Sequence, residues 1–234
     1  MMNKKGLKET WKQFIIVMAG NILQMLSKLI VWLVIPKLLG VEEYGYYKIF
    51  TLYLTYAAFL HFGFPDGILL LFAGKQYLEV NRGKFKTFSQ FFIAFQCTVS
   101  ICIVFLGITV LNAEAKFLLI VLGIDSFFIN VATYYKFISQ AVMRFHELTI
   151  RNIIQAVFQV ISLCLLYILL KINIHISGGK IYILFIVAID GILCIWYMVT
   201  YSALTFGRGE KLSDCIHEII NIFKNGILLT IAYQ

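Results

Sequence analysis

Long apolar runs alternate with short polar loops along this chain. Six stretches of roughly 18 to 22 mostly apolar residues recur, and the loops between them carry nearly all of the charge. A helix of about 20 apolar residues spans the hydrocarbon core of a bilayer, which is about 30 Å thick. The pattern therefore predicts an all-α, polytopic membrane helix bundle with six transmembrane helices. The predicted spans are Phe14–Ile35, Tyr47–Phe64, Phe91–Leu111, Phe117–Tyr135, Ile153–Leu170 and Ile181–Tyr201.

Two parts of the chain depart from this regular pattern. The second run extends through Ile68–Ala73 if its helix is bent or interrupted at Pro65 and Gly67. Over residues 211–224, apolar residues recur at helical spacing beside an acidic polar side, which predicts a helix along the cytoplasmic membrane interface. A seventh apolar run begins near Gly226 and is too short to cross. The predicted organisation is a six-helix lobe over 1–205, a connector over 206–225 and the truncated start of a seventh span over 226–234.

Composition and charge support a membrane protein and exclude a nucleic-acid binder. Hydrophobic residues make up 61% of the chain and charged residues 14%, against about 25% charged in a soluble domain. The net charge of +8 is scattered over short loops without a basic patch. The N-terminal segment and alternate loops hold 14 Lys and Arg, and the opposing loops hold five. This bias predicts a cytoplasmic N-terminus.

Three ionisable residues fall inside the predicted spans. These are Lys28 in the first, Asp125 in the fourth and Asp190 in the sixth. At 1.5 Å per helical residue, they lie about 10, 12 and 14 Å below the outer ends of their spans. We therefore expect a shared polar site. The alternatives are that Lys28 extends its ammonium to the interface, and that the aspartates are hydrogen-bonded structural ties.

Uncharged polar residues form stripes on three predicted spans. The stripes are Asn21, Gln24 and Lys28 on the first, Ser126, Asn130 and Thr133 on the fourth, and Asn152, Gln155, Gln159 and Ser162 on the fifth. Interhelical hydrogen bonds can explain such stripes, at about 0.6 to 2 kcal/mol per contact. Because three helices carry them, we expect a water-filled cavity instead. Arg144 and Arg151 lie at the cytoplasmic rim, where they can attract phosphate or simply follow the positive-inside rule.

Catalytic, metal-binding and cofactor-binding motifs are missing. The five cysteines show no CxxC spacing, so neither a disulfide framework nor a metal site is expected. The chain has no nucleophile elbow, P-loop, H-E-x-x-H or G-x-G-x-x-G. The first apolar run is too long for a signal peptide and lacks a cleavage site, so we expect a retained first span. We predict that the protein is not an enzyme and has no cofactor.

One loop resembles a known family. The segment from Pro36 to Tyr47 reads PKLLGVEEYGYY and resembles the first external loop of the polysaccharide transporter family. These are the O-antigen and lipid-linked oligosaccharide flippases of the multidrug/oligosaccharidyl-lipid/polysaccharide superfamily. The segment from His61 to Phe64 is similar to the family's Asp-Leu-Gly-Leu-type ending of the second span, with His in place of the acid. The stretch from Ser139 to Phe145 is similar to the family's connection between spans four and five.

The resemblance implies a two-lobed transporter in the bacterial plasma membrane, with six helices in each lobe and the cavity between the lobes. It would move polyprenyl-diphosphate-linked oligosaccharide from the cytoplasmic to the outer leaflet. This chain would hold one lobe. Its partners would be membrane lipids, the lipid-linked oligosaccharide, a second transporter half, and a polysaccharide polymerase or glycosyltransferases.

The residue roles that follow are hypotheses. An anionic diphosphate in a membrane needs cations, and Lys28 is the one cation at depth. Asp125 and Asp190 can exchange a proton or sodium ion to drive the cycle. The full predicted substrate-binding set is Lys28, Asn21, Gln24, Asn130, Asn152, Gln155, Gln159, Arg144 and Arg151.

Three other functions remain open at this point. A non-transporting membrane assembly subunit would need the polar residues only for packing. A drug/cation antiporter of the same superfamily would use the carboxylates for ion exchange. A membrane-embedded enzyme is the third, although no substrate-orienting motif accompanies the two aspartates.

Overall fold

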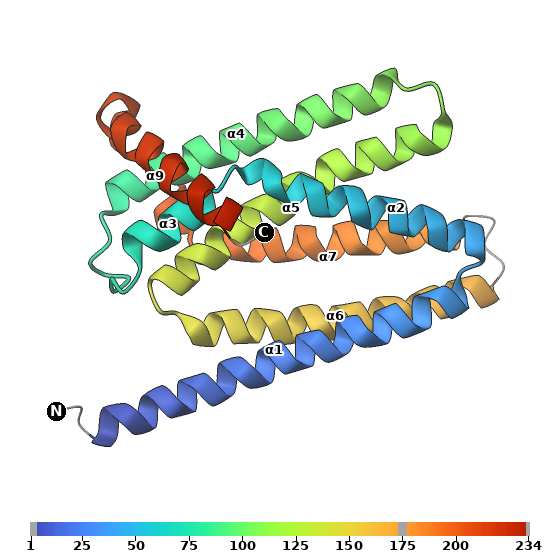
Figure 1. Ribbon diagram of the computed structural model, residues 1–234, viewed down its shortest axis with the longest axis horizontal. Helices are drawn as coiled ribbons and strands as arrows, with labels where there is room; N and C mark the ends of the chain where they lie inside the picture. The colour runs from blue at the N-terminus through green and yellow to red at the C-terminus, as the bar shows by residue number, and fades with distance from the viewer. Residues whose placement is uncertain (1–3, 173–176, 233–234) are drawn as a thin grey trace. The chain divides into compact units, whose positions relative to one another are not determined.

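The computed structural model describes residues 4–172 and 177–232, and every regular element in these two ranges is a helix. The predicted all-α class is confirmed. Figure 1 shows the elements, which are α1 (Lys4–Leu38), α2 (Val41–Ala58), the 3-10 helix η1 (Phe59–His61), α3 (Phe64–Phe72), α4 (Arg82–Thr109), α5 (Ala113–Ala141), α6 (Phe145–Lys171), α7 (Gly178–Thr200), α8 (Ser202–Thr205) and α9 (Leu212–Ala232).

Several helices are long and apolar enough to cross a membrane. Among the described residues there are five, namely part of α1 (Ile15–Leu38), α4, α5, α6 and α7. A sixth span results if α2, η1 and α3 are taken together as one broken helix. This agrees with a multi-pass membrane protein. The number of spans and the lobe arrangement stay predictions, as does the cytoplasmic N-terminus.

The chain divides into two compact units, and the division passes through α2 and α7. The first unit is Met1–Lys48 with Arg144–Ile189, and the second is Ile49–Met143 with Asp190–Gln234. In the first unit, α1 packs along α6 (Figure 1). In the second unit, α4 and α5 form an antiparallel hairpin that packs against α3, η1, α8 and α9.

Aromatic side chains fill the core of the second unit. Phe64 stacks on Phe92 with ring centroids 5.1 Å apart, and Phe92 stacks on Tyr134 at 4.9 Å. A buried tyrosine hydroxyl needs a partner when no water reaches it. The hydroxyl of Tyr134 lies 2.9 Å from the Ser89 hydroxyl, and that of Tyr135 lies 2.6 Å from the Thr205 hydroxyl. Polar residues of this core therefore have structural roles.

The second predicted span differs from the structure. The sequence placed a bend at Pro65 and Gly67, but the helix breaks earlier, at Phe62 and Gly63. Pro65 belongs to the first turn of α3 instead. The physical reason is that proline lacks an N–H and has φ fixed near −65°, which suits the start of a helix.

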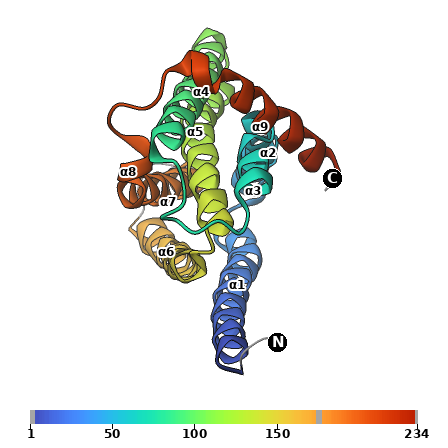
Figure 2. The same ribbon diagram turned by 90° about the vertical axis from the view of Figure 1, so that its left-hand side faces the viewer.

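The predicted connector and the start of the seventh run form one continuous helix. α9 runs from Leu212 to Ala232 without interruption at Gly226. Residues 233–234 of the predicted seventh run lie outside the described residues. Figure 2 shows α9 lying across α3, with which it is in contact.

Candidate functional site

The candidate site surrounds a break in an apolar helix of the second unit. Phe62 and Gly63 both have left-handed backbones, with φ of 49° and 72°. The two parts of the helix are bent by 50° at this break. The Gly63 N–H donates a hydrogen bond to Nδ1 of His61, 3.0 Å away. His61 therefore satisfies one backbone donor that the break exposes.

Two buried amides satisfy the carbonyls on the other side of the break. A helix end leaves its last C=O groups without partners, and the interior of a membrane offers no water to bind them. Gln96 of α4 donates from Nε2 to the Leu60 carbonyl oxygen at 3.1 Å. Asn130 of α5 donates from Nδ2 to the Ala57 oxygen at 3.2 Å and to Oε1 of Gln96 at 3.0 Å. The break is thus held by the side chains of Gln96 and Asn130, which are both buried.

Helix α9 packs directly on the same break through glycines. A Cβ added at Gly226 would overlap the carbonyl oxygen of Gly63, and one at Gly67 would overlap the carbonyl oxygen of Ile222. Glycines spaced as Gly63-x-x-x-Gly67 permit such a backbone-to-backbone crossing. Thr230 adds a hydrogen bond from Oγ1 to Oδ2 of Asp66, 3.0 Å away. The first turn of α3 is therefore fixed against α9.

Asp125 is a buried carboxylate that lacks hydrogen-bond partners among the described residues. Its side chain is fully buried, and neither carboxylate oxygen has a hydrogen-bond partner. Asp190, on α7 in the same unit, is close enough to interact with it electrostatically. Burying a carboxylate without a partner is costly, so such a group is neutralised by a proton or balanced by a cation. The ion exchange expected of this pair from the sequence stays a prediction.

The predicted polar residues of the first unit bind one another. Asn152 donates from Nδ2 to Oδ1 of Asn21 at 3.0 Å, and Gln24 donates from Nε2 to Oε1 of Gln155 at 2.6 Å. Gln159 accepts at 2.8 Å from the Ser27 hydroxyl, which the prediction had not included. These contacts form a ladder between α1 and α6. Such a ladder is the interhelical hydrogen bonding that the sequence analysis gave as the alternative to a water-filled cavity.

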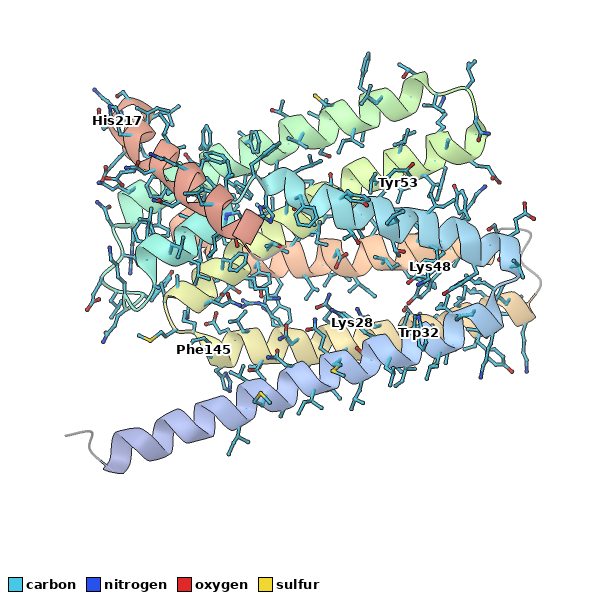
Figure 3. All side chains as sticks on the ribbon, in the orientation of Figure 1. Lys28, Trp32, Lys48, Tyr53, Phe145 and His217 are labelled. Atoms are coloured by element: carbon cyan, nitrogen blue, oxygen red, sulfur yellow. The ribbon has the colours of Figure 1, made fainter. Side chains whose placement is uncertain are left out.

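The predicted cations lie in the same unit as the ladder. Lys28 of α1, labelled in Figure 3, has an exposed side chain. Arg144 and Arg151 share one carboxylate, with Nη2 of Arg144 2.6 Å and Nη1 of Arg151 3.6 Å from Glu147. Glu147 therefore offsets part of the positive charge of Arg144 and Arg151, which the sequence analysis had considered as a site that attracts phosphate. The predicted site of Lys28 with both aspartates stays a prediction, since Lys28 belongs to the first unit and the aspartates to the second.

Sequence reasoning found Asn130 but missed its partners. Gln96 carries no special sequence signal, because it is one amide in a mostly apolar run. The Gly63-x-x-x-Gly67 spacing was a visible signal for close helix packing. The matching Gly226 lies far away in sequence, so only the fold shows that the glycines meet.

The chain was compared with family models, curated proteins and solved structures. None of them matches. The features of this chain that bear on function are the broken helix, the buried carboxylates and the resemblance of the Pro36–Tyr47 loop.

Asn130→Leu is expected to destabilise the second unit by about 2 kcal/mol. The change leaves the Ala57 carbonyl and Oε1 of Gln96 without their donor inside an apolar core. Thermal unfolding of the detergent-solubilised protein measures the loss. Thr98→Val is the matched control, because the exposed Thr98 hydroxyl bonds only within its own helix. Equal melting temperatures for both variants would contradict the role of Asn130.

Gln24→Ala and Gln155→Ala are each expected to cost about 1 kcal/mol of stability. The double variant should cost little more than either single change, because all three remove the same hydrogen bond. A double-mutant cycle on thermal unfolding measures this coupling. Met25→Ala, on the 71% exposed neighbour in α1, should show no coupling to Gln155→Ala. Additive losses for the two glutamines would contradict the ladder.

Proposed function

We propose that this chain is part of a membrane carrier that flips polyprenyl-diphosphate-linked oligosaccharide from the cytoplasmic to the outer leaflet. The carrier would serve cell-surface polysaccharide synthesis in a bacterial plasma membrane. The observation that carries the proposal is a broken apolar helix. The backbone groups that lose their helical partners at the break are bound by buried polar side chains. Non-helical backbone at membrane depth is tolerated where protein buries it or where it lines a cavity.

Broken helices are a recurring feature of secondary transporters. Their half-helix ends provide backbone groups near the bilayer midplane, where substrates and coupling ions bind. In this chain Asp125 and Asp190 add two interacting carboxylates in the same unit as the break. Binding and release of a proton or cation at this pair would give the carrier two states of different charge.

The cargo is proposed from the family resemblance. The PKLLGVEEYGYY loop from Pro36 to Tyr47 favours a lipid-linked glycan. In the structure Glu43 of this loop accepts a hydrogen bond from the Gly178 N–H at 3.1 Å, and the ring of Tyr47 packs edge-on against Tyr182 at 5.3 Å. These contacts join the start of α2 to the start of α7 within the first unit. Residues of the resembling loop therefore have a role in folding as well.

Complementation tests the proposal. Bacterial cells that lack their own lipid-linked oligosaccharide flippase would receive the gene of this chain, and surface polysaccharide would be quantified. We expect restored surface polysaccharide and no gain in drug resistance. Cells that accumulate lipid-linked oligosaccharide in the cytoplasmic leaflet despite normal expression would refute a flippase.

The second candidate is a drug/cation antiporter of the same superfamily. The observation that favours it is the pair of interacting carboxylates, because an antiporter must exchange its substrate for an ion. The same cells distinguish the two functions. Drug resistance and drug-dependent ion flux, without recovery of surface polysaccharide, would favour the antiporter.

A further inference from the structure

A pocket of the second unit adjoins the broken-helix site, because Ile222 of α9 lines the pocket and also meets Gly67. It has a volume of about 430 Å³ and lies between the end of α3, the loop after it, the start of α4 and the middle of α9. Small-molecule pockets in proteins commonly measure about 300 to 1,000 Å³. In Figure 3 the label of His217 marks the α9 helix whose following turns form one wall. The pocket is therefore large enough for a ligand.

Charges of both signs line this pocket and balance one another. Lys84 forms an ion pair with Glu218, so these two charges already satisfy each other. Lys75 and Glu79 supply a second cation and a second anion. Glu79 uses Oε2 to accept the Gln76 N–H at 3.0 Å, so its other carboxylate oxygen remains for a ligand. A ligand that carries one positive and one negative group matches this lining better than a purely anionic one.

Amide and apolar groups complete the pocket. Asn221 and Asn225 lie one turn apart on α9 and can donate hydrogen bonds to phosphate oxygens. The opposite lining includes Phe72, whose ring lies 4.7 Å from Nζ of Lys75, and Leu71, which is 42% exposed. Leu70, the preceding residue, is 49% exposed. Exposed leucines at the end of a candidate span, beside a charged pocket, match the boundary between acyl chains and headgroups.

We propose that this pocket binds the zwitterionic headgroup of a membrane phospholipid, of the phosphoethanolamine type. Lys75, Asn221 and Asn225 bind the phosphate, and Glu79 accepts hydrogen bonds from the primary ammonium. The acyl chains of the lipid lie along Leu70 and Leu71. Balanced charge selects against anionic headgroups, and the need for N–H donors at Glu79 selects against a quaternary ammonium. This inference is independent of the proposed transport function.

Native mass spectrometry of the detergent-solubilised full chain tests the proposal. The probes are phosphatidylethanolamine, phosphatidylcholine and phosphatidylglycerol with identical acyl chains. We expect one retained phosphatidylethanolamine per chain, with about tenfold weaker retention of each of the other two lipids. That ratio corresponds to about 1.4 kcal/mol. Equal retention of all three lipids, or preference for phosphatidylglycerol, would overturn the proposal.

Variants locate the binding to the pocket. Lys75→Met should reduce retention of phosphatidylethanolamine about tenfold, and Glu79→Gln should remove its advantage over phosphatidylcholine. Glu79→Gln keeps a carbonyl oxygen for the Gln76 N–H, so the loop is preserved, and thermal unfolding of each variant checks the fold. Lys116→Met is the matched control, because Lys116 is exposed on α5 and does not line the pocket. Unchanged retention in Lys75→Met, or an equal loss in Lys116→Met, would refute the assignment.

A soluble competitor separates a membrane lipid from a free ligand. Glycerophosphoethanolamine carries the same headgroup without acyl chains. We expect no displacement of the bound lipid at a hundredfold molar excess, because the leucine contacts are missing. Full displacement would assign the pocket to a soluble ligand and overturn the lipid assignment.

Discussion

Gly226→Ala is expected to separate α9 from the broken helix and to destabilise the second unit by about 3 kcal/mol. The added Cβ would overlap the carbonyl oxygen of Gly63, and backbone atoms cannot move aside as the tip of a flexible side chain can. If α9 shifts away, the hydrogen bond between Thr230 and Asp66 is lost as well. The effect is large because one methyl group disturbs a crossing that depends on direct backbone contact.

Two measurements test this expectation. Thermal unfolding in detergent should show a clear drop in melting temperature, and trypsin should cut after the exposed Lys224 of α9 faster than in the parent protein. Gly45→Ala is the matched control, because a Cβ at Gly45 meets nothing within 4 Å. That variant should gain about 0.5 to 1 kcal/mol, since Gly45 lies inside a helix. A Gly226→Ala variant as stable as the parent would disprove the close crossing.

Asp125→Leu is expected to stabilise the protein and to abolish the transport activity that we propose for it. A fully buried carboxylate without hydrogen-bond partners is replaced by an apolar side chain of similar size, which should gain about 1 to 3 kcal/mol. Transport should fall to the level of cells without the gene, because the pair with Asp190 can no longer bind a proton or cation. A gain in stability joined to a loss of function distinguishes a functional carboxylate from a structural one.

The complementation assay and thermal unfolding provide the two readouts for this variant. Asp190→Asn should also abolish transport, since both carboxylates belong to one pair. The control is Asp214→Asn, which removes an exposed carboxylate from α9 and should change neither quantity. If Asp125→Leu lowers stability and leaves transport intact, the carboxylate is a structural tie, as the sequence left open.

Continuous apolar runs predicted the long helices well, because a run of about 20 apolar residues has few other structures available in a membrane. The helix starts were predicted less well. α6 begins at Phe145, eight residues before the predicted start at Ile153, and α4 begins at Arg82, nine residues before Phe91. Charged and polar residues occupy these first turns. A prediction from hydropathy leaves these residues out of the spans, although they are helical. At the start of α4, the Asn81 side chain caps the helix by accepting hydrogen bonds from two of its first N–H groups.

The candidate site was predictable only in part. The polar stripes on α1 and α6 were visible, since residues three or four apart share a helix face. The hydrogen bonding between these two stripes was not visible in the sequence, because a polar stripe has the same residue spacing whether it faces water or a polar stripe on another helix. Asp125 was singled out by the cost of a carboxylate at depth. An interruption of the second span was expected at Pro65 and Gly67, but its exact position needed the structure. Glycine permits the left-handed backbone of Gly63, whereas nothing in the sequence marks Phe62 as left-handed.

The lengths of α4 and α5 have a consequence for the membrane around the protein. They hold 28 and 29 residues, and at 1.5 Å per residue each is about 42 to 44 Å long. This exceeds the hydrocarbon thickness by about 12 to 14 Å. Asparagine caps at Asn81 and Asn112 fix their starts, so the excess cannot be removed by fraying there. If both helices cross a bilayer, the hairpin must tilt or extend into the headgroups, and its angle will follow the hydrophobic mismatch when the thickness of the host bilayer changes.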